Sequence, residues 1–567
     1  MTKKHLFGCN SLVLAGLMCV ALKATGATYY VDPQASAGGS GSAQSPFSNI
    51  ASCNSILRPG DTCLLKGGTY VNQTIVPARS GAPGAPITYA AASGETPKLT
   101  KITRQGGTAI FLNEGQDWIT IKGITVDGEY ALTALGVPHP GAVNGWVKVG
   151  DDETMVGSQN IVFEHNRFYR GSANRNYDCF DIAGPSSDIQ VRHNVFEECG
   201  TDQNGDNKAK GNNVHFGPHT QRILFERNQV NRGGHDSMNI RGRYHVIQNN
   251  EVGNTWNAIG NDYGVRIFSF ETYFNEENRF VIQNNVFWGV GRNVRLGKLL
   301  TTGSIVRGNR FGGYVSSAAE GLTANTCCGY NDNAIYSVGQ RIYNNEFENV
   351  NGREIMLFKT LNTDNAKVHD NVFKNNAINN LGADQVAALY QIKPEHVLPG
   401  QDPFNRNQWI NNSFADSTVY VRETENGIGR IDIHSAQNNY PETFANNLMG
   451  QFRGENQGAD LTRVTRNSSG RQLHVADAAY FTDGNNVIPG DFIRIGSGAP
   501  IQVTSVNYQN NILTLSQSVS ANVGQPVNLI FSGDEPSTGV YQGASPGISG
   551  QSLTVRKPMP PQNITFQ

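Results

Sequence analysis

Apolar and polar positions along this chain follow one pattern that recurs for most of its length. In this pattern one residue separates two apolar residues. An asparagine follows three positions after the second of them, and a further apolar residue follows two positions after the asparagine, as in IVFEHNRF at 161–168. A degenerate copy without the asparagine, ITIKGITV, stands at 119–126. Such short alternating segments predict β-strands. The copies recur every 22 to 41 residues, and their later asparagines are Asn194, Asn228, Asn250, Asn285, Asn309, Asn345, Asn371, Asn412 and Asn447.

A repeat of this length, built of short strands, predicts an all-β solenoid. One turn cannot bury its apolar face alone, so successive turns stack and share a continuous core. Asparagine tolerates the left-handed backbone of a tight bend. Stacked turns would also place the asparagines in a ladder, with each amide bonded to the next. We therefore predict a parallel β-helix over residues 28–455.

Different structures are expected at the two ends of the coil. An open β-helix end is an exposed edge that needs a cover, and residues 46–57 can form a short amphipathic helix there. Beyond residue 455 the repeat stops, and we expect a small β domain over 456–567. Its role stays open between carbohydrate binding, capping and oligomerisation. The segments that alternate like antiparallel strands are 491–495, 500–506, 511–515 and 526–530.

The first 27 residues predict a signal peptide. Lys3 and Lys4 form a basic start, and the apolar run 12–22 is too short to span a membrane comfortably. Small residues at 24–27 would allow cleavage near Ala27. Nothing later resembles a transmembrane segment. The protein is therefore expected to be secreted, outside the cell or in the periplasm.

Charge and cysteine content agree with export. Loss of residues 1–27 would leave 42 basic and 47 acidic residues, a net charge of about −5, which argues against a nucleic-acid partner. Six cysteines would remain, and disulfides are common in exported proteins. Cys53 with Cys63 is the favoured pair, a second pair between Cys179 and Cys199 stays open, and the adjacent cysteines at 327–328 stay unassigned.

A second set of short strands supplies candidate chemistry. It runs through 146–150, 179–183, 213–217, 237–241 and 264–268, each with apolar residues at alternate positions. The intervening side chains point outward. If the strands stack in register, the outward column consists of Lys148, Asp181, His215, Asn239 and Arg266. Such a column could be no more than a solvated face, but its ionisable members lie beside long insertions, which favours a site.

We assign provisional roles to this column and its neighbours. The catalytic candidates are His215, Lys148, Arg266 and Asp181, because histidine titrates near neutrality and an aspartate can orient it. The candidates for substrate binding are Asn239, Arg241, His235, Asp236, Tyr263 and Trp146. The aromatic members could equally be buried or pack in loops. No metal ligands are assigned.

The beginning of the predicted coil resembles a known family. Residues 28–34 (TYYVDPQ), 45–50 (SPFSNI), 58–70 (RPGDTCLLKGGTY) and 81–89 (GAPGAPITY) are similar to the opening of secreted pectate-lyase-like proteins, including alginate-lyase and chondroitinase relatives. This resemblance implies a right-handed parallel β-helix and a polysaccharide substrate. It allows a Ca²⁺ cofactor. The pectate-lyase-like superfamily also contains glycosidases, epimerases and surface proteins, so the resemblance is less specific for the reaction.

The reaction expected from the resemblance is β-elimination on a uronate-containing polysaccharide such as alginate or pectate. It needs a base, a proton donor and a group that neutralises the uronate carboxylate. Three alternatives remain. A glycoside hydrolase would need two carboxylates, for which Asp181 and Asp236 are available. A uronate C5-epimerase shares the proton abstraction, and a non-catalytic glycan-binding surface protein would need no catalytic residue. The particular glycan and the oligomeric state stay open.

Overall fold

The computed structural model describes most of the chain between residues 26 and 530. Residues 1–25 of the predicted signal peptide, His235, Tyr263 and the cysteines at 327–328 lie outside the described residues. The described ranges are 26–100, 107–128, 145–171, 178–199, 212–233, 236–254, 266–271, 277–289, 295–312, 322–325, 336–348, 354–360, 367–379, 381, 385–452 and 458–530.

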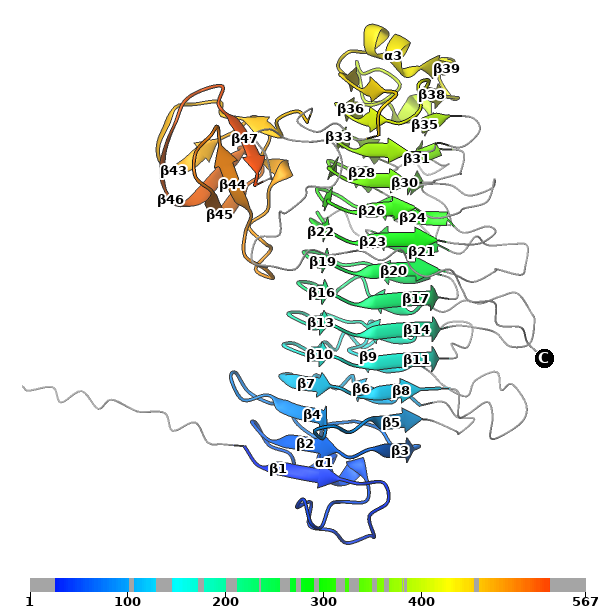
Figure 1. The fold of residues 1–567 in the computed structure, drawn as a ribbon, viewed down its shortest axis with the longest axis vertical. Helices are drawn as coiled ribbons and strands as arrows, with labels where there is room; N and C mark the ends of the chain where they lie inside the picture. The colour runs from blue at the N-terminus through cyan, green and yellow to red at the C-terminus, as the bar shows by residue number, and fades with distance from the viewer. Residues whose placement is uncertain are drawn as a thin grey trace, which may run out of the picture.

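Strands of the main body form three long sheets that wind around one axis (Figure 1). Nearly every strand pairs in parallel with the equivalent strand of the next turn, which confirms the predicted solenoid. Sheet A consists of β1 (Thr28–Val31), β2 (Thr62–Leu65), β4 (Ile87–Ala91), β7 (Ile119–Lys122), β10 (Val162–Glu164), β13 (Gln190–Arg192), β16 (Leu224–Glu226), β19 (Val246–Gln248), β22 (Val281–Gln283), β25 (Ile305–Arg307), β29 (Arg341–Tyr343), β33 (Val372–Lys374), β36 (Gln408–Ile410) and β40 (Phe444–Ala445).

The other two sheets complete each turn. Sheet B consists of β3 (Gly68–Val71), β5 (Pro97–Thr100), β8 (Thr125–Asp127), β11 (Arg167–Gly171), β14 (Val195–Cys199), β17 (Gln229–Gly233), β20 (Glu251–Asn254), β23 (Val286–Gly289), β26 (Arg310–Gly312), β30 (Glu346–Glu348), β34 (Ala377–Asn379), β37 (Ser413–Phe414) and β41 (Leu448–Met449). Sheet C consists of β6 (Ile110–Leu112), β9 (Val147–Val149), β12 (Phe180–Ile182), β15 (Val214–Phe216), β18 (Asp236–Ile240), β21 (Arg266–Glu271), β24 (Arg295–Leu300), β27 (Leu322–Asn325), β31 (Glu354–Lys359), β35 (Val386–Gln391), β38 (Tyr420–Glu423) and the antiparallel β39 (Gly429–Asp432).

The core of the coil is built from stacked apolar side chains. Phe168 lies 5.1 Å from Phe196 in the next turn, centroid to centroid. Phe287, Phe311 and Phe347 continue such a stack further along the axis. Stacked aromatic rings add to the hydrophobic stabilisation of buried area. Because the strands alternate, the same period that fills the core also aims polar side chains outward.

The asparagine ladder is buried and continuous. The amide oxygen of Asn228 accepts hydrogen bonds from the backbone N–H and the side-chain amide of Asn194, at 2.9 and 3.1 Å. The left-handed residue is the one before each asparagine, such as His165, His193 and Arg227. The ladder asparagines therefore act through their side chains, contrary to our expectation for the bend.

One predicted member of the ladder is displaced. The amide of Asn345 bonds to Asn376, and Asn376 bonds to Asn412, so Asn376 occupies the position expected for Asn371. Asn371 instead bonds to Asn407. Asn371 precedes its sheet A strand, β33, whereas Asn376 follows it, as the other ladder asparagines follow theirs. The preceding strand β32 (Lys367–His369) pairs with β28 (Tyr336–Val338) outside the three main sheets.

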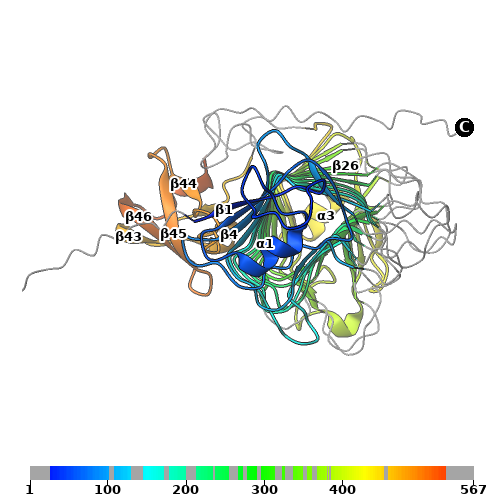
Figure 2. The same ribbon diagram turned by 90° about the horizontal axis from the view of Figure 1, so that it is seen from below.

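A short helix covers the N-terminal end of the coil. Helix α1 (Ile50–Ile56) begins at Asn49, whose side chain accepts a hydrogen bond from the backbone of Ser52. Figure 2, seen along the axis, shows α1 lying across that end. The predicted disulfide between Cys53 and Cys63 joins the helix to β2. A second helix, α3 (Ile433–Asn439), lies at the opposite end (Figure 1).

Residues 458–530 form a separate antiparallel sheet beside sheet A (Figure 1). Its core packs against residues of sheet A, including Ile305 and Tyr343. Its strands are β42 (Thr462–Arg463), β43 (Ser468–His474), β44 (Phe492–Ile495), β45 (Ile501–Asn507), β46 (Ile512–Ala521) and β47 (Pro526–Leu529). Short 3₁₀ turns, Pro394–His396 and Ala478–Tyr480, complete the described elements. No helix in the described ranges is long and apolar enough to cross a membrane.

Candidate functional site

The outward side chains of three adjacent strands in sheet C form the candidate site. Strand β12 lies between β9 and β15, and the register places Asp181 beside Lys148 on one side and His215 on the other. Phe180 and Ile182, the flanking residues of β12, are fully buried. The alternation of this strand therefore turns Asp181 away from the core.

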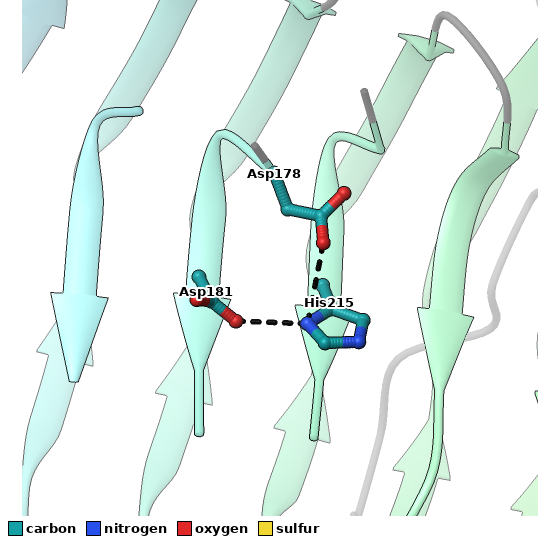
Figure 3. Close-up of side chains that lie close together, drawn as sticks. All are labelled: Asp178, Asp181 and His215. Atoms are coloured by element: carbon teal, nitrogen blue, oxygen red, sulfur yellow. Dashed lines mark hydrogen bonds and ion pairs between the residues drawn. The ribbon is translucent and has the colours of Figure 1, made fainter. Parts of the chain in front are cut away.

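His215 is held by two carboxylates (Figure 3). Its Nδ1 lies 2.8 Å from Oδ1 of Asp181 and 3.3 Å from Oδ2 of Asp178. The other oxygen of Asp178 accepts hydrogen bonds from the backbone and side-chain amides of Asn212, at 3.0 and 2.7 Å. Within the described part of the chain, no hydrogen-bond partner contacts Nε2 of His215. That atom can accordingly exchange a proton with a ligand.

Burial and charge act in opposite directions on this group. The side chain of His215 is 12% exposed, and burial lowers its pKa, but the charges of Asp178 and Asp181 raise it more, so its net pKa lies above the ordinary value. Burial raises the pKa of Asp178, against the opposing effect of His215. Arg241 lowers the pKa values of both His215 and Asp178, so its charge acts on the same site.

Lys148 is tied to a neighbouring acid. Its Nζ lies 2.7 Å from Oδ2 of Asp151. Burial lowers the pKa of Lys148, but Asp151 and Asp181 raise it more, so the net pKa is raised. A lysine that holds its proton this firmly is poorly suited to act as a base. Its position favours a role as a fixed positive charge.

Arg266 does not join the predicted column. The backbone register pairs Arg266 with Asp236, and Ser269 stands opposite Asn239. Our expectation rested on the alternation of Val265 and Ile267. Ile267 is buried in the core, but Phe268 and Phe270 are the residues that lie opposite the core residues of β18. Two overlapping apolar alternations compete in this segment, and the aromatic one sets the register.

Two predicted substrate-binding residues are buried. Trp146 has no exposed surface and packs 6.0 Å from Phe168, centroid to centroid, so it cannot stack on a sugar. Asp236 is also fully buried, which makes it unsuited to the hydrolase pair with Asp181. Both corrections have one cause: neither lies at an outward position of a strand. The predicted His235 and Tyr263 lie outside the described residues.

The remaining predicted residues do lie beside the carboxylate–histidine group. Asn239 follows His215 in the column, and the side chain of Arg241 contacts Glu271, two residues beyond Ser269. The sequence reasoning missed Asp178 as a member of the site. Its spacing to Asp181 was an available signal, but only the folded chain shows that both carboxylates reach one imidazole.

The donor set at this position does not match Ca²⁺. Among the described residues, Asp178, Asp181 and His215 form the one group of three potential ligands, with their atoms within 4.8 Å of one another. Ca²⁺ takes roughly six to eight oxygen ligands, whereas this group offers two carboxylates and a nitrogen. Nδ1 of His215 is already paired with both carboxylates. This group therefore does not fit Ca²⁺.

The comparisons define the class of fold. Residues 29–222 match the family described as the Pel9A-like, right-handed β-helix region. This match confirms both the right-handed parallel β-helix and the resemblance to pectate-lyase-like proteins. A comparison with curated proteins found no match.

Several solved structures are similar at low identity. Pectate lyase Pel9A is 18% identical, with 64% of this chain and 77% of that chain covered and a TM-score of 0.38. The mannuronan C-5 epimerase AlgE4 A-module of Azotobacter vinelandii is 12% identical, with coverages of 65% and 90% and a TM-score of 0.39. The surface adhesin PfbA of Streptococcus pneumoniae is 15% identical, with coverages of 66% and 87% and a TM-score of 0.39. At identities this low, these structures do not indicate which reaction the chain performs.

Proposed function

We propose that this protein is a secreted polysaccharide lyase that cleaves a uronate-containing polysaccharide by β-elimination, with His215 as the proton-transferring residue. One observation carries the proposal: two carboxylates hold Nδ1 of His215 on an outward face of the coil, at 2.8 and 3.3 Å. Such contacts orient the ring and stabilise the imidazolium that forms when Nε2 takes a proton. The disulfides support action in an oxidising compartment.

The proposed reaction is balanced without a co-reactant. Nε2 of neutral His215 removes the proton from C5 of the uronate, and the electron pair of that bond forms the C4–C5 double bond. The bond from C4 to the 4-linked oxygen breaks, and the leaving oxygen takes a proton, for which the new imidazolium is a donor. The Lys148 ammonium supplies positive charge toward the carboxylate of the reacting uronate.

The decisive experiment follows ultraviolet absorbance of the unsaturated uronate product. Purified protein is mixed with alginate, pectate and glycosaminoglycans, with and without added Ca²⁺ or chelator. We expect absorbance to rise with one acidic polysaccharide, and His215→Ala to slow it by about 10² to 10⁴-fold. Asn510→Ala, an exposed position in the C-terminal domain, serves as the control and should retain full activity.

The pH dependence gives a second readout of His215. The base must be neutral, and the pKa of His215 is raised above 6.5, so kcat/KM should increase with pH through a midpoint above that value. Asp178→Asn removes one of the charges that raise this pKa and should move the midpoint to lower pH. A midpoint that stays in place in Asp178→Asn would exclude His215 as the titrating base.

One observation favours glycoside hydrolysis as a second candidate function. Atoms of Asp178 and Asp181 lie within 4.8 Å of each other, close to the spacing of about 5 Å in retaining hydrolases. The pKa of Asp178 is raised, as a general acid requires. New reducing ends without absorbance would support this candidate. If neither an unsaturated product nor new reducing ends were detected, the protein would be an epimerase or a non-catalytic binding protein. Measuring proton exchange at C5 would distinguish these two functions, because only the epimerase exchanges that proton.

A further inference from the structure

The outward polar column of sheet C continues beyond the residues that the sequence singled out. After His215 and Asn239, the register places Ser269 and then Lys298 at the next two positions. Adjacent strands lie about 4.8 Å apart, so these groups extend the candidate site along the coil axis. A bound polysaccharide that followed the axis would pass from His215 over Asn239 to this second group.

The second group is organised around one carboxylate. Oε1 of Glu271 accepts a hydrogen bond from Oγ of Ser269 at 2.8 Å and lies 3.2 Å from Nζ of Lys298. Oε2 of Glu271 lies 3.6 Å from Nε of Arg241. The three charged side chains are 10–22% exposed. Glu271 thus brings two cationic groups together beside the column.

A hydrogen-bond acceptor lies between this group and His215. Asn239 is 5% exposed, and among the described residues none donates a hydrogen bond to its Oδ1. A buried unsatisfied acceptor is destabilising, and a hydroxyl-bearing ligand would satisfy it. Two cations and one acceptor match an acidic sugar, which carries a carboxylate and several hydroxyls.

We propose that Arg241 and Lys298 bind the carboxylate of an acidic sugar next to the one that reacts at His215, that Asn239 accepts a hydrogen bond from a sugar hydroxyl, and that Glu271 is the positioning residue for both cations. This inference deepens the proposed function, on which it rests for the class of ligand. It adds a subsite that selects uronates over neutral sugars. Binding at this subsite does not require cleavage.

The test measures binding in a chain that cannot turn over. Oligogalacturonate and oligomannuronate are titrated calorimetrically into His215→Ala, alone and combined with Lys298→Met. The same oligosaccharides with their carboxyl groups reduced to alcohols serve as neutral ligands. Loss of one charged hydrogen bond should raise the Kd of an acidic oligosaccharide by about 10-fold or more. The Kd of the neutral ligand should not change.

Two further variants separate binding from folding. Lys298→Arg keeps the charge and should restore most of the affinity. Lys122→Met removes a lysine that is paired with Glu164 on sheet A, and it should leave the Kd unchanged. An unaltered Kd in Lys298→Met, or equal weakening for acidic and neutral ligands, would overturn the inference, as would absence of acidic-ligand binding.

The outcomes also separate this inference from the proposed function. Charge-dependent binding without any cleavage by the unsubstituted protein would contradict the lyase and retain the subsite. Cleavage by the unsubstituted protein, combined with a Kd that does not change in Lys298→Met, would support the lyase and contradict the proposed subsite. Glu271→Gln should weaken acidic ligands selectively, because the two cations lose the carboxylate that positions them.

Discussion

His245 is a fully buried histidine whose ring packs against Phe216, the residue that follows His215. Its Nδ1 accepts a hydrogen bond from the backbone N–H of Ile223, and its Nε2 donates to the carbonyl oxygen of Arg241 at 2.8 Å. Burial lowers its pKa to about 3, against the opposing effect of the bond to Arg241. A neutral ring therefore holds the backbone from which the Arg241 side chain projects.

Acid should destabilise the protein through His245. The unfolded chain takes up a proton below pH 6.5, whereas folded His245 does so only near pH 3, so this group's contribution to stability is lost as pH falls through that window. The loss is about 1.4 kcal/mol per pH unit. Denaturant unfolding at pH 7.5 and 5 should show a smaller loss in His245→Gln than in the unsubstituted protein. Equal losses would contradict the assignment.

At the scale of the element, the asparagine ladder fastens each turn of the coil to the next. The side-chain amide of Asn285 donates to the carbonyl of Ile247 at 2.8 Å and to Oδ1 of Asn309 at 3.0 Å. Its own Oδ1 accepts from the backbone and side-chain amides of Asn250. All these groups are buried, so each would be unsatisfied without its partner.

Asn285→Ala should therefore destabilise the coil although it removes little volume. Each buried group left unpaired costs about 1–3 kcal/mol, so the free energy of unfolding should fall by at least about 2 kcal/mol. Equilibrium denaturation measures the change. Asn510→Ala, at an exposed position, should change it by less than about 0.5 kcal/mol. A loss no greater in Asn285→Ala than in that control would show that the ladder is not stabilising.

At the scale of the whole molecule, the C-terminal domain is joined to sheet A by a buried ion pair. Arg307 is 7% exposed and Asp491 3%, and the guanidinium contacts both carboxylate oxygens. Arg307 also donates to Gln283, and Asp491 accepts from the backbone of Thr482. Buried charges are tolerated only when they are paired and hydrogen-bonded in this way.

Breaking this pair on one side should be costly. Asp491→Ala leaves the Arg307 charge buried without its carboxylate and should destabilise by about 3–5 kcal/mol, whereas Arg307→Met combined with Asp491→Leu should recover most of the loss. Thermal unfolding and limited proteolysis of the two variants provide the comparison. Arg463→Ala disrupts a largely exposed pair with Asp460 and should cost at most about 1 kcal/mol. No rescue in the double variant would contradict this account.

The repeat and its alternation were sufficient to predict the strands, the stacked coil and the outward direction of Asp181 and His215. These properties are local: a period of two decides which side chains enter the core, and one turn resembles the next. The same rule assigned Lys148 and Asn239 to the column. The disulfide between Cys53 and Cys63 could also be predicted, because these cysteines flank a short connection from helix to strand. The pairing of Cys179 with Cys199 was decided by the structure.

Only the tertiary structure decided which neighbours those residues acquire. The register between turns placed Ser269 rather than Arg266 beside Asn239, and Asn376 rather than Asn371 in the ladder. A bend before β12 brought Asp178 to His215. Register and bends depend on inserted loops and on pairing between segments far apart in sequence. Alternation within one strand therefore determines its faces, while packing between turns determines the chemistry.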